Sequence, residues 1–178
     1  MKNSKFGYYF KLTLTLLIIS AVVSGLLGLT NFITEGKIAE IKAQKTAASM
    51  QEVLPAEVYS QIEYTGAETL VSAVHQAGEN AYVIEVTPSG FGGVITMVVG
   101  VDNGTVTGVS IISMAETSGL GDNASKADFR DQFVGGTGEL AVNKDGGTID
   151  ALTGATITSR AVTDGVNAAL RAAAELMG

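Results

Sequence analysis

The sequence predicts an α+β fold, with one N-terminal transmembrane helix followed by a single domain that has an antiparallel sheet and flanking helices. Three observations support this prediction. Residues 12–34 form an uncharged apolar run, β-rich segments joined by turn residues follow in the middle of the chain, and an amphipathic helical pattern closes it. Central strands flanked by helices are typical of an α+β domain. The 178 residues leave room for one such domain behind the apolar run.

The run from Leu12 to Thr34 is 23 residues long and contains no charge. A membrane-spanning helix needs about 20 apolar residues, whereas the apolar core of a cleaved signal peptide has about 7–15. We therefore expect an uncleaved single-pass membrane anchor. Lys2, Lys5 and Lys11 precede the run and favour a cytoplasmic N-terminus.

Small residues recur every four positions in the apolar run, at Ser20, Ser24 and Gly28. This spacing lets a neighbouring membrane helix approach closely, which indicates membrane partners. The alternative is that small residues are simply common in membrane helices.

The remainder of the chain is strongly acidic. All 18 acidic residues lie at Glu35 or later, against eight basic ones, so this part carries a net charge of −10. Such a surface repels phosphate backbones, which excludes nucleic-acid binding. Cysteine is absent and His75 is the only histidine, expected to be exposed in a loop or helix. Redox chemistry would then need an organic cofactor.

Helical patterns flank the predicted sheet. Residues 35–54 favour a helix that ends at Pro55 and extends the anchor as a stalk. Residues 127–133 predict a short helix, with Phe129 and Phe133 one turn apart. Apolar residues at three- and four-residue spacing predict an amphipathic helix over 159–177. The resulting division is a cytoplasmic tail and anchor at 1–34, a stalk at 35–55 and the domain at 56–178.

The predicted strands are residues 81–87, which end at Pro88, and residues 94–101 and 105–112. The last two are joined by Asp102-Asn103-Gly104, a strong hairpin signal. Residues 57–76 mix short apolar stretches with polar residues and favour no single element.

Two polar, Gly-rich segments are candidates for a ligand site. The first, residues 115–122, offers Glu116, Thr117 and Ser118 as polar contacts, with Gly119 and Gly121 for close backbone approach. Its alternative is a plain turn.

The second segment, residues 150–159, leads into the last helix. Thr156, Thr158 and Ser159 gather where free amides and the helix dipole favour a phosphate, and the small residues Gly154 and Ala155 leave the Thr156 hydroxyl accessible. Its alternative is ordinary capping of the helix by one of these hydroxyls.

These segments resemble the FMN-binding domain family. Asp-Ala-Leu-Thr-Gly-Ala-Thr at 150–156 resembles the family's flavinylation motif Asp-x-x-Ser/Thr-Gly-Ala-Thr, and Glu-Thr-Ser-Gly-Leu-Gly at 116–121 resembles its Glu-Thr-Pro-Gly-Leu-Gly loop. With the anchor and the Gly-Phe-Gly-Gly-Val-Ile segment at 90–95, the resemblance extends over nearly the whole chain. It points in particular to the G subunits of Rnf-type complexes, and to the related C subunits of the sodium-pumping NADH:quinone reductase.

The resemblance implies a cofactor and its site. FMN would be bound covalently, through a phosphoester to Thr156. Thr117, Leu120 and Gly121 become candidates for ring or ribityl contacts. The full set of cofactor-binding candidates is Glu116, Thr117, Gly119, Leu120, Gly121, Thr153, Gly154, Ala155, Thr156, Thr158 and Ser159.

The resemblance also implies a role and partners. The chain would be an electron-transfer subunit of an ion-translocating oxidoreductase complex between ferredoxin and NAD, with no independent active site. Its partners would be the other membrane and redox subunits and a flavin transferase that uses FAD to load Thr156. The chain would lie in the cytoplasmic (inner) membrane, with the flavin domain on its outer (extracytoplasmic) side. Two alternatives stay open: a stand-alone extracellular flavin reductase, and a membrane-anchored binding module without redox function.

Overall fold

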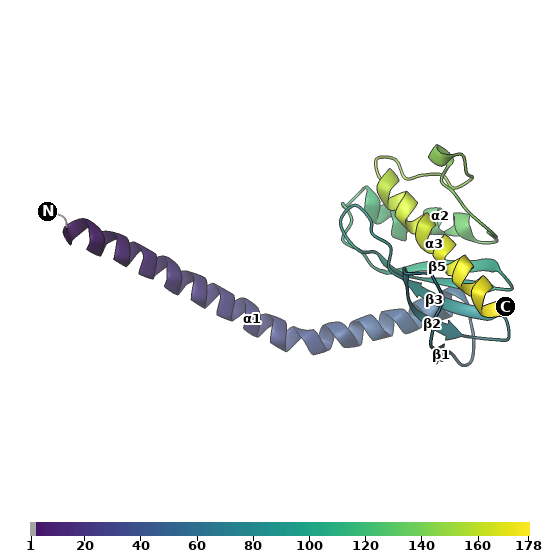
Figure 1. Ribbon diagram of the computed structural model, residues 1–178, viewed down its shortest axis with the longest axis horizontal. Coiled ribbons are helices and arrows are strands. Elements are labelled where there is room, and N and C mark those ends of the chain that lie inside the picture. Colours follow the sequence, from purple (N-terminus) through teal and green to yellow (C-terminus); the bar gives the residue numbers. More distant parts are fainter. Residues whose placement is uncertain (1–2) are drawn as a thin grey trace. The chain divides into compact units, whose positions relative to one another are not determined.

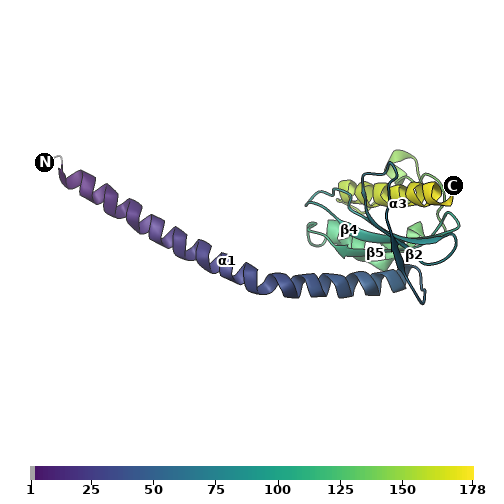
Figure 2. The same cartoon turned by 60° about the horizontal axis from the view of Figure 1, so that its bottom comes forward.

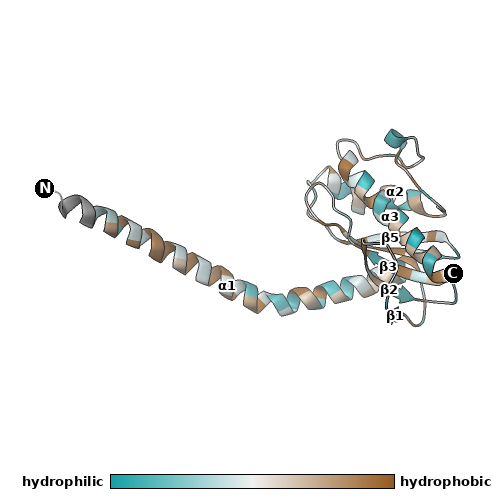
Figure 3. Ribbon diagram, viewed as in Figure 1, coloured by the Kyte–Doolittle hydropathy of each residue, from teal (hydrophilic) through white to brown (hydrophobic). Residues whose placement is uncertain are grey.

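The computed structural model describes the backbone of residues 3–178 and the side chains of residues 7–178. Lys2 and the side chain of Lys5, two of the lysines that predict the orientation of the anchor, lie outside this part. The chain begins with the long helix α1, Asn3–Val53 (Figure 1). From Gly7 onward this helix is long and apolar enough to cross a membrane. Apolar residues dominate its first half, and polar ones are interspersed in its second half (Figure 3).

An antiparallel sheet follows α1 (Figure 2). It has five strands, which lie in sequence order. Its strands are β1 Ser60–Ile62, β2 Val71–Gln76, β3 Ala81–Val86, β4 Thr96–Asp102 and β5 Thr105–Ser113. Asn103 and Gly104 form the β4–β5 turn with φ of 47° and 75°. Positive φ at both positions matches the right-handed twist of the strands, as in other Asn-Gly hairpins.

Short helices and α3 complete the domain. They are the 3-10 helix η1 Gly121–Ser125, α2 Ala127–Arg130, the 3-10 helices η2 Asp131–Phe133 and η3 Asn143–Asp145, and α3 Thr156–Met177. The rings of Phe129 and Phe133 pack edge to face with centroids 5.5 Å apart, and both are buried. The two aromatic residues of the predicted short helix therefore belong to the core.

Alternate residues of β3 and β4 enter two different apolar clusters, as the pleat of a sheet requires. Ile84 of β3 and Val99 of β4 belong to the larger cluster, which also contains Val162, Val166 and Ala169 of α3. Val83 and Val98 point to the opposite side, where they pack with Met50 and Val53 of α1. The sheet is thus covered on one face by α3 and on the other by the last turns of α1.

Two paired glycines make room for the end of α1. Gly100 of β4 lies opposite Gly108 of β5, and a Cβ at either position would lie within 3 Å of the Val53 backbone. The Thr107 hydroxyl donates a hydrogen bond to the Val53 carbonyl at 2.6 Å. One carbonyl at the C-terminal end of the helix is thereby satisfied by the sheet.

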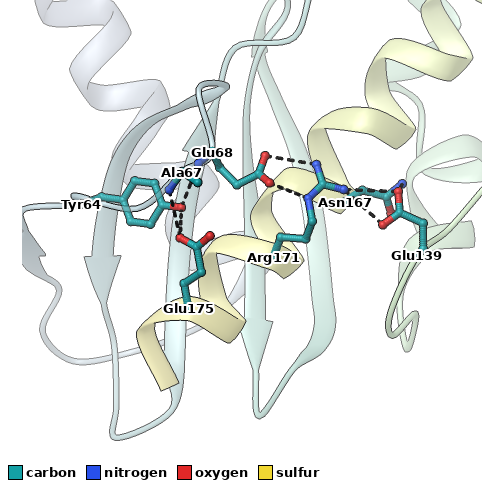
Figure 4. A network of polar contacts seen from close by, with 7 residues as sticks. All are labelled: Tyr64, Ala67, Glu68, Glu139, Asn167, Arg171 and Glu175. Atoms are coloured by element: carbon teal, nitrogen blue, oxygen red, sulfur yellow. Dashed lines mark hydrogen bonds and ion pairs between the residues drawn. The ribbon is translucent and has the colours of Figure 1, made fainter. Parts of the chain in front are cut away.

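A polar network holds the second half of α3 (Figure 4). Arg171 Nε lies 2.6 Å from Glu68 Oε1, and Arg171 Nη1 lies 3.1 Å from Glu139 Oε2. The guanidinium of Arg171 lowers the pKa of Glu68. Asn167, which is buried, donates to the Leu140 carbonyl and accepts from the Leu140 amide. These contacts tie α3 to the loops before β2 and after η2.

The predicted α+β class and antiparallel sheet are confirmed, and the predicted hairpin is present. The last helix begins at Thr156 and not at Ser159 as predicted, because the turn at Gly154, with φ of 75°, leads directly into helical residues. The prediction for His75 was wrong, since it is half-buried in β2. Residues 57–76 contain β1 and β2.

The predicted domain boundaries at residues 34 and 55 stay predictions. In the structure, the compact unit runs from Gln44 to Gly178, because the last turns of α1 pack against the sheet. The proposed packing face at Ser20, Ser24 and Gly28 also stays a prediction.

Candidate functional site

The two segments singled out in the sequence meet at one cavity of about 450 Å³. The first segment follows β5, and the second leads into α3. The cavity is lined by Phe91, Glu116, Thr117, Leu120, Gly121, Lys144, Gly154, Ala155, Thr156, Ile157 and Thr158. Eight of these eleven residues are among the predicted candidates.

Glu116 connects three segments of the cavity wall. Its Oε2 accepts a hydrogen bond from the Thr158 hydroxyl at 2.7 Å, and its Oε1 accepts one from the Gly92 amide at 3.0 Å. The loop after β5, the loop before β4 and the first turn of α3 are therefore held by one carboxylate. A Cβ at Gly121 would lie 2.6 Å from Glu116 Oε2 and 2.8 Å from the Thr158 hydroxyl oxygen, so this contact requires glycine there.

The first loop is closed by its own backbone. The amides of Leu120 and Asp122 both donate to the Thr117 carbonyl, and Gly119 adopts a φ of 77°. Ser118, which stands where the family motif has proline, donates a hydrogen bond from its hydroxyl to Asp122 at 3.2 Å. This side-chain hydrogen bond therefore restrains the loop, as the ring of a proline would.

The first turn of α3 leaves three amides without an acceptor. Ala155 occupies the N-cap position, and its side chain forms no capping hydrogen bond. The first amide of this region bonded within the helix is that of Ser159, to the Ala155 carbonyl. Within residues 3–178, the amides of Thr156, Ile157 and Thr158 have no hydrogen-bond acceptor. Free amides at the positive end of a helix form a natural site for an anion such as phosphate.

The three clustered hydroxyls differ in their availability. Thr158 is 1% exposed and donates to Glu116, while Ser159 is fully buried and donates to the Ala155 carbonyl. Thr156 is half-buried, and its hydroxyl has no hydrogen bond to any described residue. The alternative role for these hydroxyls was ordinary N-capping, and none of them caps α3.

Three predicted candidates lie away from the cavity. Gly119 and Thr153 line a neighbouring hollow of about 520 Å³, which shares Leu120 with the cavity. Ser159 is buried, and its hydroxyl also accepts a hydrogen bond from the Leu152 amide of the motif at 2.9 Å. Ser159 therefore holds the backbone of the motif through its side chain.

Sequence analysis missed three residues that line the cavity. Phe91 lies in the Gly-Phe-Gly-Gly segment that resembles the family, but no sequence pattern predicted that it lines the cavity. Ile157 is 53% exposed in the first turn of α3, and its position off the apolar stripe of this helix was a usable signal. Lys144 comes from η3, six residues before the second motif. No sequence signal marked it.

Comparison with known proteins places these features in a family. Residues 90–171 match the model of the FMN-binding domain. The chain is 37% identical to the G subunit of the Na(+)-translocating ferredoxin:NAD(+) oxidoreductase complex of Acetobacterium woodii, covering 91% of this chain and 90% of that protein. It is 31% identical to the G subunit of the ion-translocating oxidoreductase complex of Methanosarcina acetivorans, covering 90% and 92%.

A solved structure has a similar fold. The crystal structure of the C subunit of the Na(+)-translocating NADH-quinone reductase from Parabacteroides distasonis aligns with a TM-score of 0.51 and 25% identity. The alignment spans 59% of this chain and 62% of that one, which is less than two thirds of the solved chain. With an FMN-binding domain over residues 90–171 and relatives of one kind along most of its length, the chain belongs to the family of G subunits of ion-translocating oxidoreductase complexes.

Proposed function

We propose that the chain is a membrane-anchored electron-transfer subunit that carries FMN covalently, through a phosphoester to Thr156. The observation that carries this proposal is the state of the Thr156 hydroxyl. It lines the cavity without a hydrogen bond to any described residue, next to three amides that also lack an acceptor. The neighbouring hydroxyls of Thr158 and Ser159 are both in use.

The residues of the cavity fit FMN in both charge and size. The free amides at the start of α3 suit a phosphate. The cavity volume of about 450 Å³ lies within the range of small-molecule sites. Phe91, Leu120 and Ile157 are 69%, 42% and 53% exposed, so the cavity has an apolar rim on which a flat aromatic ring can lie.

Attachment requires a nucleophile, a donor and a leaving group. The Thr156 oxygen forms a bond to the phosphorus of FAD that bears the riboflavin, and the bond from that phosphorus to the bridging oxygen breaks. AMP leaves with the electron pair, and the hydroxyl proton passes to a base of the transferase. The dipole and amides of α3 stabilise the charge on the phosphate oxygens. When bound, FMN supplies one- and two-electron redox chemistry through its isoalloxazine ring.

The names of the relatives support a place in an Rnf-type complex that moves electrons between ferredoxin and NAD. In this proposal the partners are the other membrane and redox subunits of the complex and a flavin transferase. Helix α1 anchors the chain in the cytoplasmic membrane, with the flavin domain on the outer side. Purification with the other subunits attached supports this assignment, whereas purification of a flavin-loaded chain alone from its native membrane favours the stand-alone reductase.

The test of the covalent site is fluorescence of the denatured chain. The full chain is expressed with a flavin transferase, separated by denaturing electrophoresis and examined under ultraviolet light. We expect a fluorescent band for the wild type and for Thr148→Ala, an exposed threonine outside the cavity. Thr156→Ala abolishes the band. A dark wild-type band beside a transferase control that works refutes the covalent assignment and favours the binding module.

A further inference from the structure

Lys144 is the cationic residue among those that line the Thr156 cavity. It is exposed, and its ammonium group forms no ion pair with any residue that the structure describes. The only acidic residue of the lining, Glu116, has its carboxylate engaged by Thr158 and Gly92. The cavity therefore contains a positive charge that no internal partner neutralises.

The residues on both sides of Lys144 are fixed. Asn143 donates a hydrogen bond from Nδ2 to Asp150 Oδ1 at 2.9 Å, and Asp150 is the first residue of the motif that ends at Thr156. Asp145 forms a two-point ion pair with Arg160, with distances of 2.7 Å and 2.6 Å. Arg160 also lowers the pKa of Asp145, so this pair persists at neutral pH. Of the three residues of η3, Lys144 alone has a side chain free to face a ligand.

The hydrogen bond of Asn143 and the ion pair of Asp145 also place η3 beside the part of the cavity that contains Thr156. Arg160 follows Thr156 by four residues, which is about one helical turn, so its partner Asp145 lies along the first turn of α3. The hydrogen bond of Asn143 ends at Asp150, the first residue of the motif. Lys144 is thus held next to the turn that contains Thr156 and the three free amides.

We propose that Lys144 is the phosphate-binding side chain of this cavity and pairs with the phosphate that joins FMN to Thr156. This inference rests on the proposed function. The free amides supply partial charges, and Lys144 supplies a full one. A full charge matters here because the chain after the anchor has a net charge of −10, which opposes the approach of an anionic flavin nucleotide. Lys144 therefore assists both the loading of the site and the holding of the phosphate.

The first measurement is the initial rate of flavin attachment to the full chain, with purified transferase and FAD, followed by in-gel fluorescence. The variants are Lys144→Met, which keeps the length but removes the charge, and Lys144→Arg, which keeps the charge. Lys126→Met is the matched control, because Lys126 is exposed and does not line the Thr156 cavity. We expect Lys144→Met to load about threefold to fivefold more slowly at low salt, in line with an exposed ion pair. Arginine restores the rate, and the control loads like the wild type.

The second measurement separates phosphate binding from contact with the transferase. After exhaustive loading, the ³¹P resonance of the phosphodiester is recorded for each variant. The proposal expects a shift in Lys144→Met, none in Lys126→Met, and a smaller difference at high salt, because salt screens exposed charges. Slower loading with an unchanged ³¹P resonance assigns Lys144 to the transferase and overturns the proposal, as does an unchanged loading rate. A wild-type chain that takes up no flavin refutes the covalent site itself, and this inference falls with it.

Discussion

Removing the Glu116 carboxylate tests whether one side chain sets the shape of the cavity. In Glu116→Ala, the Thr158 hydroxyl and the Gly92 amide both lose their acceptor. Thr158 is 1% exposed, so water does not readily replace the lost partner. Gly92 is exposed, and water can hydrogen-bond to its amide.

The magnitude follows from this difference in exposure. A buried donor left unsatisfied costs about 1–3 kcal/mol, while an exposed one costs little. We therefore expect Glu116→Ala to lower the free energy of unfolding by about 2 kcal/mol, nearly all of it from Thr158. Glu116→Gln should cost less than about 1 kcal/mol, because the amide can accept from Gly92 and donate to the Thr158 hydroxyl.

The assay is urea denaturation of the full chain in detergent, followed by far-ultraviolet circular dichroism. Glu116→Ala, Thr158→Val and the double variant form a double-mutant cycle. If the contact is real, the coupling energy between the two sites is about 1–2 kcal/mol. Thr148→Val serves as the control, since this exposed residue lies outside the cavity. If the free-energy costs of the two single variants add up to the cost of the double variant to within about 0.5 kcal/mol, the role assigned to Glu116 is refuted.

Three further changes probe the support of the domain, each by urea denaturation. Gly108→Val places a Cβ 2.9 Å from Val53 Cα and should cost about 1–3 kcal/mol; an unchanged midpoint would contradict the packing of α1 on the sheet. Phe133→Ala empties a fully buried site and should cost about 3–5 kcal/mol; an unchanged midpoint would contradict the burial of this ring in the core. Arg171→Met should cost about 0.5–1 kcal/mol at pH 7. Because Arg171 lowers the pKa of Glu68, this stabilisation is present above the unfolded pKa and is lost as the pH falls through the folded one. The difference between wild type and Arg171→Met should therefore shrink as the pH falls below the ordinary pKa of glutamate, and a difference that does not shrink in acid would exclude the ion pair as its cause.

Local patterns were sufficient for several elements. Asn103-Gly104 predicts the β4–β5 turn because both residues tolerate positive φ, and the β-branched and aromatic residues of 81–87, which end at Pro88, predict a strand. The start of α3 was placed three residues late, because hydroxyl residues were expected to precede the helix as caps. Residues 57–76 gave no clear period, because β1 and β2 lie at one side of the sheet and are only partly buried.

The two motifs could be found in the sequence because their chemistry is local: glycines where a loop must turn and hydroxyls where a helix begins. Which hydroxyl stays free could not be found in this way. Thr156 and Thr158 are similar in sequence, and only the fold brings Glu116 to Thr158 and leaves Thr156 unpaired.

The sequence by itself determined the membrane-length helix, the class of the domain and the positions of both motifs, because these depend on composition, periodicity and turn chemistry within a few residues. The tertiary structure decided which residues share the cavity. Lys144 lines the cavity from η3, whose residues Asn143 and Asp145 contact Asp150 and Arg160. The last turns of α1 join the domain only because Gly100 and Gly108 leave space on the sheet. Contacts between residues far apart in the chain follow from packing, and no local pattern encodes them.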